Sequence, residues 1–152
     1  MKLETLLKKE RIPFSKSRHE PAYTSQELAQ KEHVPGRTVA KPVIVRGERG
    51  YAMCVIPASA RLDLVKTAEV LQEFEVVMAT EQEMMKLFPD CELGAEPPVG
   101  RLFGIKTLID ESLELDDYVV MQCGRHTESI RIAREDYEKL CRPIVADIVV
   151  GP

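Results

Sequence analysis

Apolar residues recur along the chain in two spacings, one typical of helices and one typical of strands. Leucines within residues 3–7 form a helical stripe near the start. A second stripe, with Leu62, Val65 and Ala68 on one side, predicts a helix over residues 61–74. Short runs rich in β-branched residues predict strands at residues 12–19, 38–45, 51–56, 75–79, 107–110, 118–123, 129–133 and 144–150.

Tight turns join several of these predicted strands. Residues 38–45 lead through a glycine-containing loop into residues 51–56, which predicts a β-hairpin. Thr24 and Thr80 are each followed three residues later by a glutamate, the capping-box pattern that begins a helix. Helices interleaved with turn-linked strands favour a mixed sheet over a doubly wound parallel one. We therefore predict an α/β fold, a single mixed-sheet, barrel-like domain with surrounding helices.

Length and composition narrow the class of protein. The 152 residues fit one domain, residues 1–152, able to bury roughly 70% of its unfolded surface. Hydrophobic residues make up 44% and charged residues 30%, as in ordinary globular proteins. No apolar stretch approaches the roughly 20 residues that cross a bilayer, and the N-terminal segment lacks the apolar centre of a signal peptide. We therefore expect a cytoplasmic protein with no membrane partner.

Charge and cysteine usage limit the partners and the chemistry. The four cysteines form no C-x-x-C pair, which indicates neither a zinc site nor a disulfide framework and predicts reduced, mostly buried thiols. A formal net charge of −4 argues against a surface that coats nucleic acid, so no DNA partner is expected. A local basic rim would still meet one end of a nucleic acid. Its candidate cations are Lys41, Arg46, Arg49, Arg101 and Arg125.

A lysine interrupts the first strand of the predicted hairpin. Lys41 shares a strand face with Val39, Val43 and Val45, because alternate residues of a strand point the same way. An ammonium among apolar neighbours must lower its pKa, reach a polar cleft, or hold an anionic or carbonyl partner. The alternative is a lysine whose stem lies over the sheet while its head reaches water. The strand alone does not decide between these interpretations.

Residues 89–100 form a segment rich in proline and glycine. Pro97 and Pro98 are stiff, and Gly94 and Gly100 flank them, so we expect a loop of fixed shape whose backbone a ligand can approach closely. Such a loop suits hydrogen bonding between its peptide groups and a small polar group. The alternative is a rigid connection between a helix and a strand. The spacing is not that of a phosphate-binding loop.

Residues 124–128 form a turn that places His126 at the tip or mouth of a predicted hairpin. Turn histidines are commonly solvated, so His126 alone identifies no site. His19 and His33 lie at the ends of a predicted strand and helix and are no stronger candidates. The chain contains no G-x-S-x-G or H-E-x-x-H string.

Five segments occur in the order and at the separations of a known family. The segments are His19-Glu20-Pro21-Ala22-Tyr23-Thr24, the strand lysine Lys41, Pro57-Ala58-Ser59-Ala60-Arg61-Leu62-Asp63-Leu64, the G-x-x-x-P loop Gly94-Ala95-Glu96-Pro97-Pro98, and Gly124-Arg125-His126-Thr127-Glu128-Ser129-Ile130-Arg131. Each segment is weak alone. Together they resemble the YbaK/EbsC group of aminoacyl-tRNA deacylases, which is related to the editing domain inserted in bacterial prolyl-tRNA synthetases, and the resemblance covers essentially the whole chain.

The resemblance implies a trans-editing hydrolase that deacylates mischarged aminoacyl-tRNA, removing a small amino acid esterified to the tRNA 3′ end. It implies no ATP, no metal and no other cofactor. An aminoacyl ester is already activated, so position and electrostatics matter more than a strong nucleophile. The implied partner is the 3′ end of aminoacyl-tRNA, and an aminoacyl-tRNA synthetase is a second candidate partner.

The resemblance also implies roles for particular residues. Lys41 is the implied catalytic residue, placed near the 3′-terminal adenosine or the ester oxygens. The loop from Gly94 to Pro98 holds the backbone atoms of the amino acid through its peptide groups. A water, oriented with help from a ribose hydroxyl, attacks the carbonyl. The implied substrate-binding residues are Thr24, Gln26, Gly94, Pro98, Gly124 and His126.

Two residues depart from the usual family pattern. Pro42 follows Lys41 where Thr or Asn is common, and a proline without a backbone N–H predicts a strand edge or cleft rim. Glu96 places a carboxylate where the loop is usually apolar. Facing the pocket, it would favour the substrate's α-ammonium or a polar side chain; we expect it to face outward as a solvated charge. The departures leave the amino acid specificity open.

Two other functions compete with hydrolysis. A non-catalytic module of the same fold, which binds aminoacyl-tRNA or a synthetase, would use Lys41 and the G-x-x-x-P loop equally well. A thiol-based redox or sulfur-transfer enzyme around Cys91 is disfavoured, because Asp90 and Glu92 would raise the pKa of its thiol.

Overall fold

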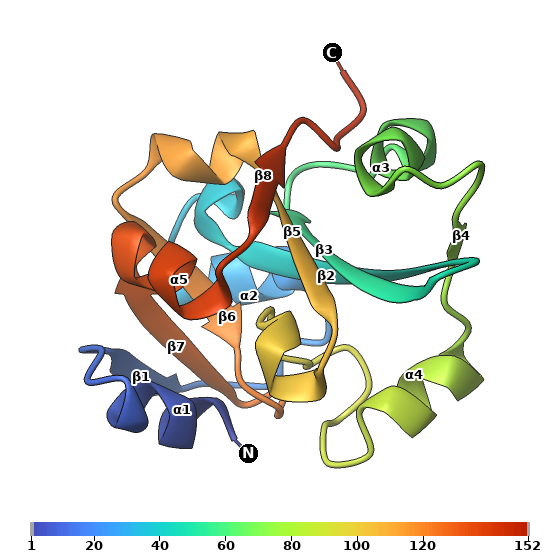
Figure 1. Cartoon of the computed structure of the whole chain (residues 1–152). Coiled ribbons are helices and arrows are strands. Elements are labelled where there is room, and N and C mark those ends of the chain that lie inside the picture. Colours follow the sequence, from blue (N-terminus) through green and yellow to red (C-terminus); the bar gives the residue numbers. More distant parts are fainter. Residues whose placement is uncertain (1, 152) are drawn as a thin grey trace.

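The computed structural model describes residues 2–151, which form two β-sheets with helices around them (Figure 1). The strands are β1 (Ser15–Arg18), β2 (Ala40–Gly47), β3 (Gly50–Pro57), β4 (Val77–Met78), β5 (Lys106–Asp110), β6 (Tyr118–Gln122), β7 (Glu128–Ala133) and β8 (Ile144–Ala146). The α-helices are α1 (Leu3–Lys9), α2 (Ser25–Glu32), α3 (Leu64–Leu71), α4 (Glu81–Leu87) and α5 (Arg134–Cys141). Short 3₁₀ turns are η1 (Gly36–Thr38), η2 (Gly100–Phe103) and η3 (Glu111–Leu115). None of the described helices is long and apolar enough to cross a membrane.

The larger sheet has the strand order β4-β2-β3-β5-β8 and contains both strand directions. Strand β2 is antiparallel to β3 and to β4, whereas β5 is parallel to both β3 and β8. The smaller sheet, β1-β7-β6, is antiparallel throughout. The predicted mixed α/β architecture and the hairpin of β2 and β3 are therefore confirmed.

The predicted barrel-like closure is wrong, because the two sheets remain open. In the described part of the chain they are joined by one isolated bridge, between Val39 and Val120. The carbonyl of Ile44 points away from β3 and accepts from the N–H of Ala79 at 2.9 Å. Pro42, two residues earlier, faces the same edge and has no N–H to donate. The missing donor interrupts pairing along β2, and Pro42 lies at an edge as predicted.

Two hydrophobic clusters lie on opposite faces of the larger sheet. Alternate residues of β3 divide between them: Met53 and Val55 belong to the cluster with α1 and α5, while Cys54 and Ile56 belong to the cluster with α3. The strand is buried on both faces, which explains its unbroken apolar sequence. The large core therefore holds β2 and β3 rigidly beneath the open edge.

Helix α3 begins later than predicted, and one residue of its predicted apolar stripe faces outward. The carboxylate of Asp63 accepts hydrogen bonds from the first backbone N–H groups of the helix, so the helix begins at Leu64. Leu62 and Ala68 of the predicted stripe pack toward the sheet together with Leu64, which confirms most of the stripe. Val65 is 71% exposed, so its predicted place in the stripe is wrong.

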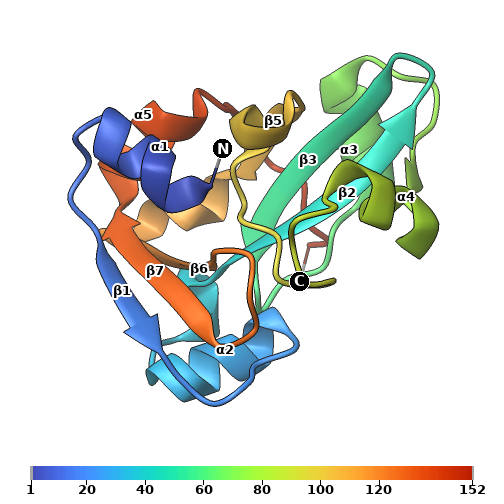
Figure 2. The ribbon, with the colours of Figure 1, turned by 90° about the horizontal axis from the view of Figure 1, so that it is seen from below.

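Helices α2 and α4 lie near opposite ends of β2, and the loop after α4 returns between them (Figure 2). Thr80 begins α4 with a complete capping box: its hydroxyl accepts from the N–H of Glu83 at 3.1 Å, and the Glu83 carboxylate accepts from the N–H of Thr80 at 3.0 Å. Thr24 caps α2 through the N–H of Glu27 at 3.0 Å. Both predicted helix starts are confirmed, but the predicted capping box is complete only at Thr80, because the Glu27 carboxylate accepts from the N–H of Tyr23 instead of Thr24. Both helix starts border the open edge of β2.

Candidate active site

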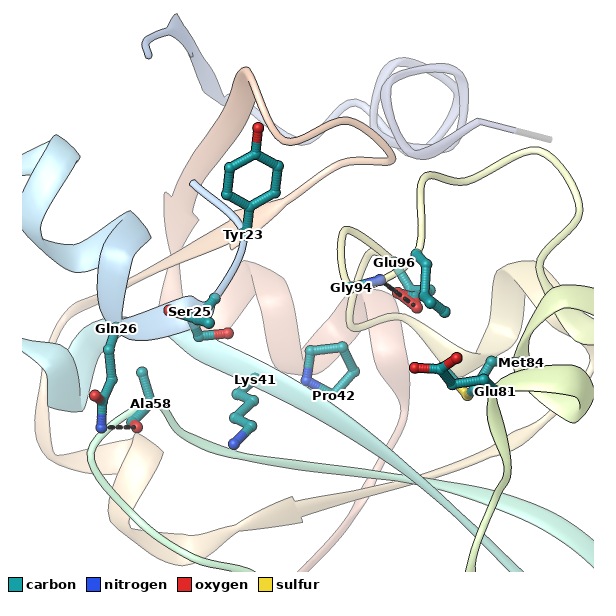
Figure 3. A pocket seen from close by; sticks show the side chains of 12 residues that line it. Tyr23, Ser25, Gln26, Lys41, Pro42, Ala58, Glu81, Met84, Gly94 and Glu96 are labelled. Carbon is teal, nitrogen blue, oxygen red and sulfur yellow. Dashed lines mark hydrogen bonds between the residues drawn. The ribbon is translucent and has the colours of Figure 1, made fainter. Parts of the chain in front are cut away.

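A cavity of about 520 Å³ lies along the open edge of β2 (Figure 3). Its floor is β2, one wall is the first turn of α2 with the residue after β3, and the opposite wall combines α4 with the G-x-x-x-P loop. Of the seven residues predicted for the site, four line this cavity: Thr24, Gln26, Lys41 and Gly94. The structure therefore brings together segments that are more than fifty residues apart in the sequence.

Lys41 is exposed and lines the cavity. Its ammonium makes no ion pair and no hydrogen bond with any residue from 2 to 151. Helix α3 packs over Val43 and Val45, which share a strand face with Lys41. Figure 3 shows the side chain extending toward Gln26, away from the opposite wall. The structure therefore removes the interpretation of a buried lysine with a fixed partner among these residues, and it leaves both a polar cleft and solvent within reach of the ammonium.

The α2 wall presents polar groups held by local hydrogen bonds. The side-chain N–H of Gln26 donates to the carbonyl of Ala58 at 3.3 Å, so α2 is tied to the end of β3. The carboxylate of Glu27 accepts from the N–H of Tyr23 at 3.2 Å and fixes the chain before the helix. Thr24 uses a lone pair of its hydroxyl for the helix cap and keeps the hydroxyl proton for another acceptor.

Glu96 faces the cavity, so the predicted outward orientation is wrong. Glu96 is 3% exposed. Both oxygens of its carboxylate accept from the N–H of Gly94, at 3.0 and 2.9 Å. Gly94 has φ +88, a left-handed conformation that curls the loop back on itself. This curl brings the carboxylate back onto the N–H group of the loop itself, and the hydrogen bonds of the loop to Gly124 and Tyr137 hold the loop so that this side faces the cavity.

The G-x-x-x-P loop uses most of its own peptide donors. The N–H of Gly94 donates to the Glu96 carboxylate, the N–H of Ala95 donates to the carbonyl of Glu92 at 2.9 Å, and the two prolines have none. Within the described residues, the N–H of Glu96 is the one loop donor without an internal acceptor. The predicted use of loop peptide groups for substrate therefore rests on this single donor and on free carbonyls.

Pro98 does not line the cavity but anchors the loop from behind. Its carbonyl accepts from the hydroxyl of Tyr137 at 2.6 Å and from the thiol of Cys141 at 3.7 Å. Both partners are buried residues of α5. Pro98 thus connects the loop to the core.

Gly124 also lies outside the cavity lining and braces the loop. Its N–H donates to the carbonyl of Ala95 at 2.8 Å, and its carbonyl accepts from the N–H of Glu92 at 2.9 Å. The turn between β6 and β7 therefore acts as a short strand-like support for the G-x-x-x-P loop.

His126 lies behind the cavity wall rather than in it. It is 8% exposed, and its Nδ1 lies 3.1 Å from the carbonyl of Ala22. Its ring centroid is 4.9 Å from that of Tyr23, and a Cβ added to Gly94 would be 3.5 Å from its Cε1. His126 therefore contacts both walls from behind and positions them.

The predicted basic rim is smaller than the sequence indicated. Carboxylates on other segments engage three of its five arginines and lysines, in the pairs Arg46–Glu83 (3.5 Å), Arg49–Glu73 (3.8 Å) and Arg101–Glu10 (2.5 Å). Lys41 and the exposed Arg125 make no such pair with any residue from 2 to 151. Of the five predicted rim cations, these two are without an ion pair among the described residues.

The sequence does not predict that α4 contributes to the cavity. Glu81 and Met84 both line it, whereas the sequence of residues 80–83 predicts only the start of a helix. The available signal was connectivity: α4 follows β4, which pairs with the strand that carries Lys41. That pairing is a tertiary contact that no local pattern encodes.

Thiol chemistry at Cys91 is disfavoured further by the structure. Burial raises the pKa of the Cys91 thiol to about 11, with additional contributions from the Glu96 and Asp90 carboxylates. We expect iodoacetamide alkylation of Cys91, followed by peptide mapping, to be slow at pH 7 and to accelerate about tenfold per pH unit up to about pH 10. The reason is that only the thiolate reacts. A rate already at its plateau by pH 8 would contradict the raised pKa.

The model of the aminoacyl-tRNA editing domain family matches residues 19–140, most of the chain. The chain therefore belongs to this family, which confirms the relationship to editing domains inferred from its sequence. The matched range contains the whole cavity lining, from the first turn of α2 to the G-x-x-x-P loop.

Proteins named proline–tRNA ligase are similar in sequence over the same region. The ligase of Fervidobacterium nodosum is 29% identical over 115 residues, covering 74% of this chain and 20% of the relative. That of Kosmotoga olearia is 28% identical over 115 residues, with the same coverage. The chain spans about a fifth of the length of these relatives.

Solved structures share the fold over nearly the whole chain. One, described as a proposed trans-editing enzyme for prolyl tRNA synthetase, has a TM-score of 0.84 at 23% identity and covers 98% of this chain and 95% of its own. Another, described only as a hypothetical protein, has a TM-score of 0.89 at 23% identity and covers 99% and 100%. At this identity the likeness establishes a common fold.

Proposed function

We propose that this protein is a trans-editing hydrolase of the YbaK/EbsC group, which removes a small, wrongly attached amino acid from the 3′ end of a tRNA in the cytoplasm. Membership of the aminoacyl-tRNA editing domain family supports this class of substrate. The observation that carries the proposal is the cavity that Lys41, whose ammonium has no partner among residues 2–151, shares with the G-x-x-x-P loop. Its volume of about 520 Å³ suits an aminoacylated terminal nucleoside.

The whole of residues 1–152 is proposed to act as one editing domain. Helix α1 and strand β1 precede the range matched by the family model. Leu3 and Leu7 of α1 are nevertheless buried in the main core, and β1 pairs with β7. These contacts support a single unit rather than an appended segment.

In the proposed reaction, a water adds to the ester carbonyl, and the bond between the carbonyl carbon and the ribose oxygen then breaks. The proton that the water loses ends on the ribose oxygen, so the products are a free amino acid and a tRNA with an intact terminal hydroxyl. The ammonium of Lys41 contacts the terminal phosphate or the carbonyl oxygen that becomes negative. A contact to the carbonyl oxygen stabilises the developing charge more than the ground state, whereas a contact to the phosphate positions the substrate.

In the proposed pocket, the residues that line the cavity contact the substrate, and the residues behind it hold the walls in position. Thr24 and Gln26 offer polar groups on one wall, and Gly94 keeps the opposite wall close. Pro98, Gly124 and His126 hold these walls in place rather than contacting substrate.

The decisive experiment is a deacylation panel. Because the relatives are proline–tRNA ligases, the first tRNA to test is specific for proline, charged in turn with Ala, Ser, Thr, Cys and Pro. We expect release of at least one small amino acid above the uncatalysed rate, with the prolyl ester hydrolysed least. Retention of intact aminoacyl-tRNA on the protein without release would instead support the non-catalytic binding module.

Recognition of tRNA is expected to centre on its 3′ end. With Lys41 and Arg125 as the available cations, we expect one or two phosphate contacts and a salt slope of about −0.7 to −1.4 in a plot of log affinity against log salt. A minimal acceptor-stem hairpin should be deacylated nearly as well as full-length tRNA. Loss of activity on the hairpin would show that the elbow or anticodon is also bound.

A further inference from the structure

A buried carboxylate faces the cavity without a cation. Glu96 is 3% exposed and lines the cavity, and no Lys, Arg or His between residues 2 and 151 forms an ion pair with it. Its one protein donor is the N–H of Gly94, shared between the two oxygens. An ionised carboxylate has about four acceptor positions, so acceptor capacity remains.

The charges of the cavity are separated between its two sides. Glu81 lies on the same wall as Glu96, opposite the side toward which Lys41 extends in Figure 3. Glu81 likewise forms no ion pair with a residue of the described chain. A buried charge is energetically costly unless it is paired. A cavity whose wall carries these carboxylates is therefore suited to a ligand that contains a cationic group.

We propose that Glu96 binds the α-ammonium of the aminoacyl ester, with Glu81 as a second carboxylate on the same side. This inference rests on the proposed function. An aminoacyl-tRNA end is itself divided in charge, with a free ammonium next to the ester carbonyl and a phosphate beyond the ribose. Placing the ammonium at Glu96 and the phosphate toward Lys41 orients the ester between them. The site thereby selects unblocked aminoacyl-tRNA over N-acylated forms such as peptidyl-tRNA.

The test compares one charged tRNA with its N-acetylated form at pH 6.5, where an α-amine is protonated. Each rate is divided by the uncatalysed rate of the same ester, because acetylation changes the intrinsic reactivity. We expect the wild-type protein to prefer the free amine, and Glu96→Gln to lower that preference by about tenfold or more, the effect of losing a hydrogen bond to a charged group. The glutamine oxygen still accepts from Gly94, which preserves the loop.

Two further variants make the test specific. Glu81→Gln, on the surface of α4, should lower the same preference without touching the loop. Glu92→Gln is the matched control: Glu92 also accepts from a backbone N–H, that of His126 at 3.0 Å, but it does not line the cavity. We expect Glu92→Gln to leave the preference for the free amine unchanged.

The outcomes separate this inference from the proposed function. A Glu96→Gln variant that slows both ester forms equally would overturn it and leave Glu96 a purely structural role. An effect confined to one amino acid would overturn it in favour of side-chain recognition. Absence of hydrolysis by the wild-type protein on either form would remove the proposed function itself, and this inference with it.

Discussion

Lys41→Ala is expected to lose about 10²-fold or more in deacylation while the melting temperature stays within a degree or two of the wild type. The rate should fall because a contact to the terminal phosphate or the developing negative oxygen is removed, which is worth on the order of 3 kcal/mol. Stability should hold because Lys41 is exposed and has no ion pair or hydrogen bond to lose among the described residues.

The measurements are kcat/KM on the ester that the panel identifies and a thermal unfolding curve. Lys86→Ala is the matched control, because Lys86 is an exposed lysine of α4 that does not line the cavity. Lys86→Ala should keep both activity and stability. Full activity in Lys41→Ala would remove the catalytic role proposed for Lys41, and a large fall in its melting temperature would identify a structural lysine instead.

Gly94→Ala should produce the second large effect, a loss of about 10²-fold in deacylation. Gly94 has φ +88, and a Cβ there would lie 3.3 Å from the carbonyl oxygen of Tyr23 and 3.5 Å from Cε1 of His126. A left-handed alanine costs roughly 1–2 kcal/mol, and the added methyl would press the loop away from the α2 wall. Geometry at this wall matters because a displacement of about 1 Å is enough to slow a positioned reaction about 10²-fold.

Gly104→Ala separates backbone strain from cavity geometry. Gly104 also has a positive φ, +67, but a Cβ there would meet no atom within 4 Å. Both variants should lose similar stability in thermal unfolding, whereas Gly94→Ala alone should lose deacylation. Equal activity in the two variants would show that the approach of the loop to Tyr23 does not govern the reaction.

The direction of the Glu96 side chain could not be predicted from the residues of the loop alone. The sequence contained the G-x-x-x-P loop, and its stiffness and glycines were recognised from residue types alone. Whether the carboxylate faced solvent or cavity depended on the braces from Gly124, Tyr137 and His126. These residues are about thirty to forty positions away in sequence, so no pattern within the loop reports them.

The same distinction explains the other differences. Pro42 was correctly expected at an edge, because a missing N–H is a property of the residue itself. The open sheets and the contribution of Glu81 to the cavity depend on how β4 and β6 meet β2, which are contacts between distant segments. Val65 was assigned to the buried stripe of α3 with Ala68, but the packing against the sheet buries Ala68 and leaves Val65 exposed.

The sequence by itself determined the alternation of helices and strands, the β2–β3 hairpin, both helix caps and membership of the editing family. These follow from periodicity, from backbone donors within a few residues, and from residue types in a set order. Only the tertiary structure decided which residues share the cavity, that Pro98 and His126 support it from behind, and that Lys41 and Glu96 present opposite charges to it. Side-chain direction in a loop and pairing between distant charges are properties of packing, and packing is complete only when the whole core has formed.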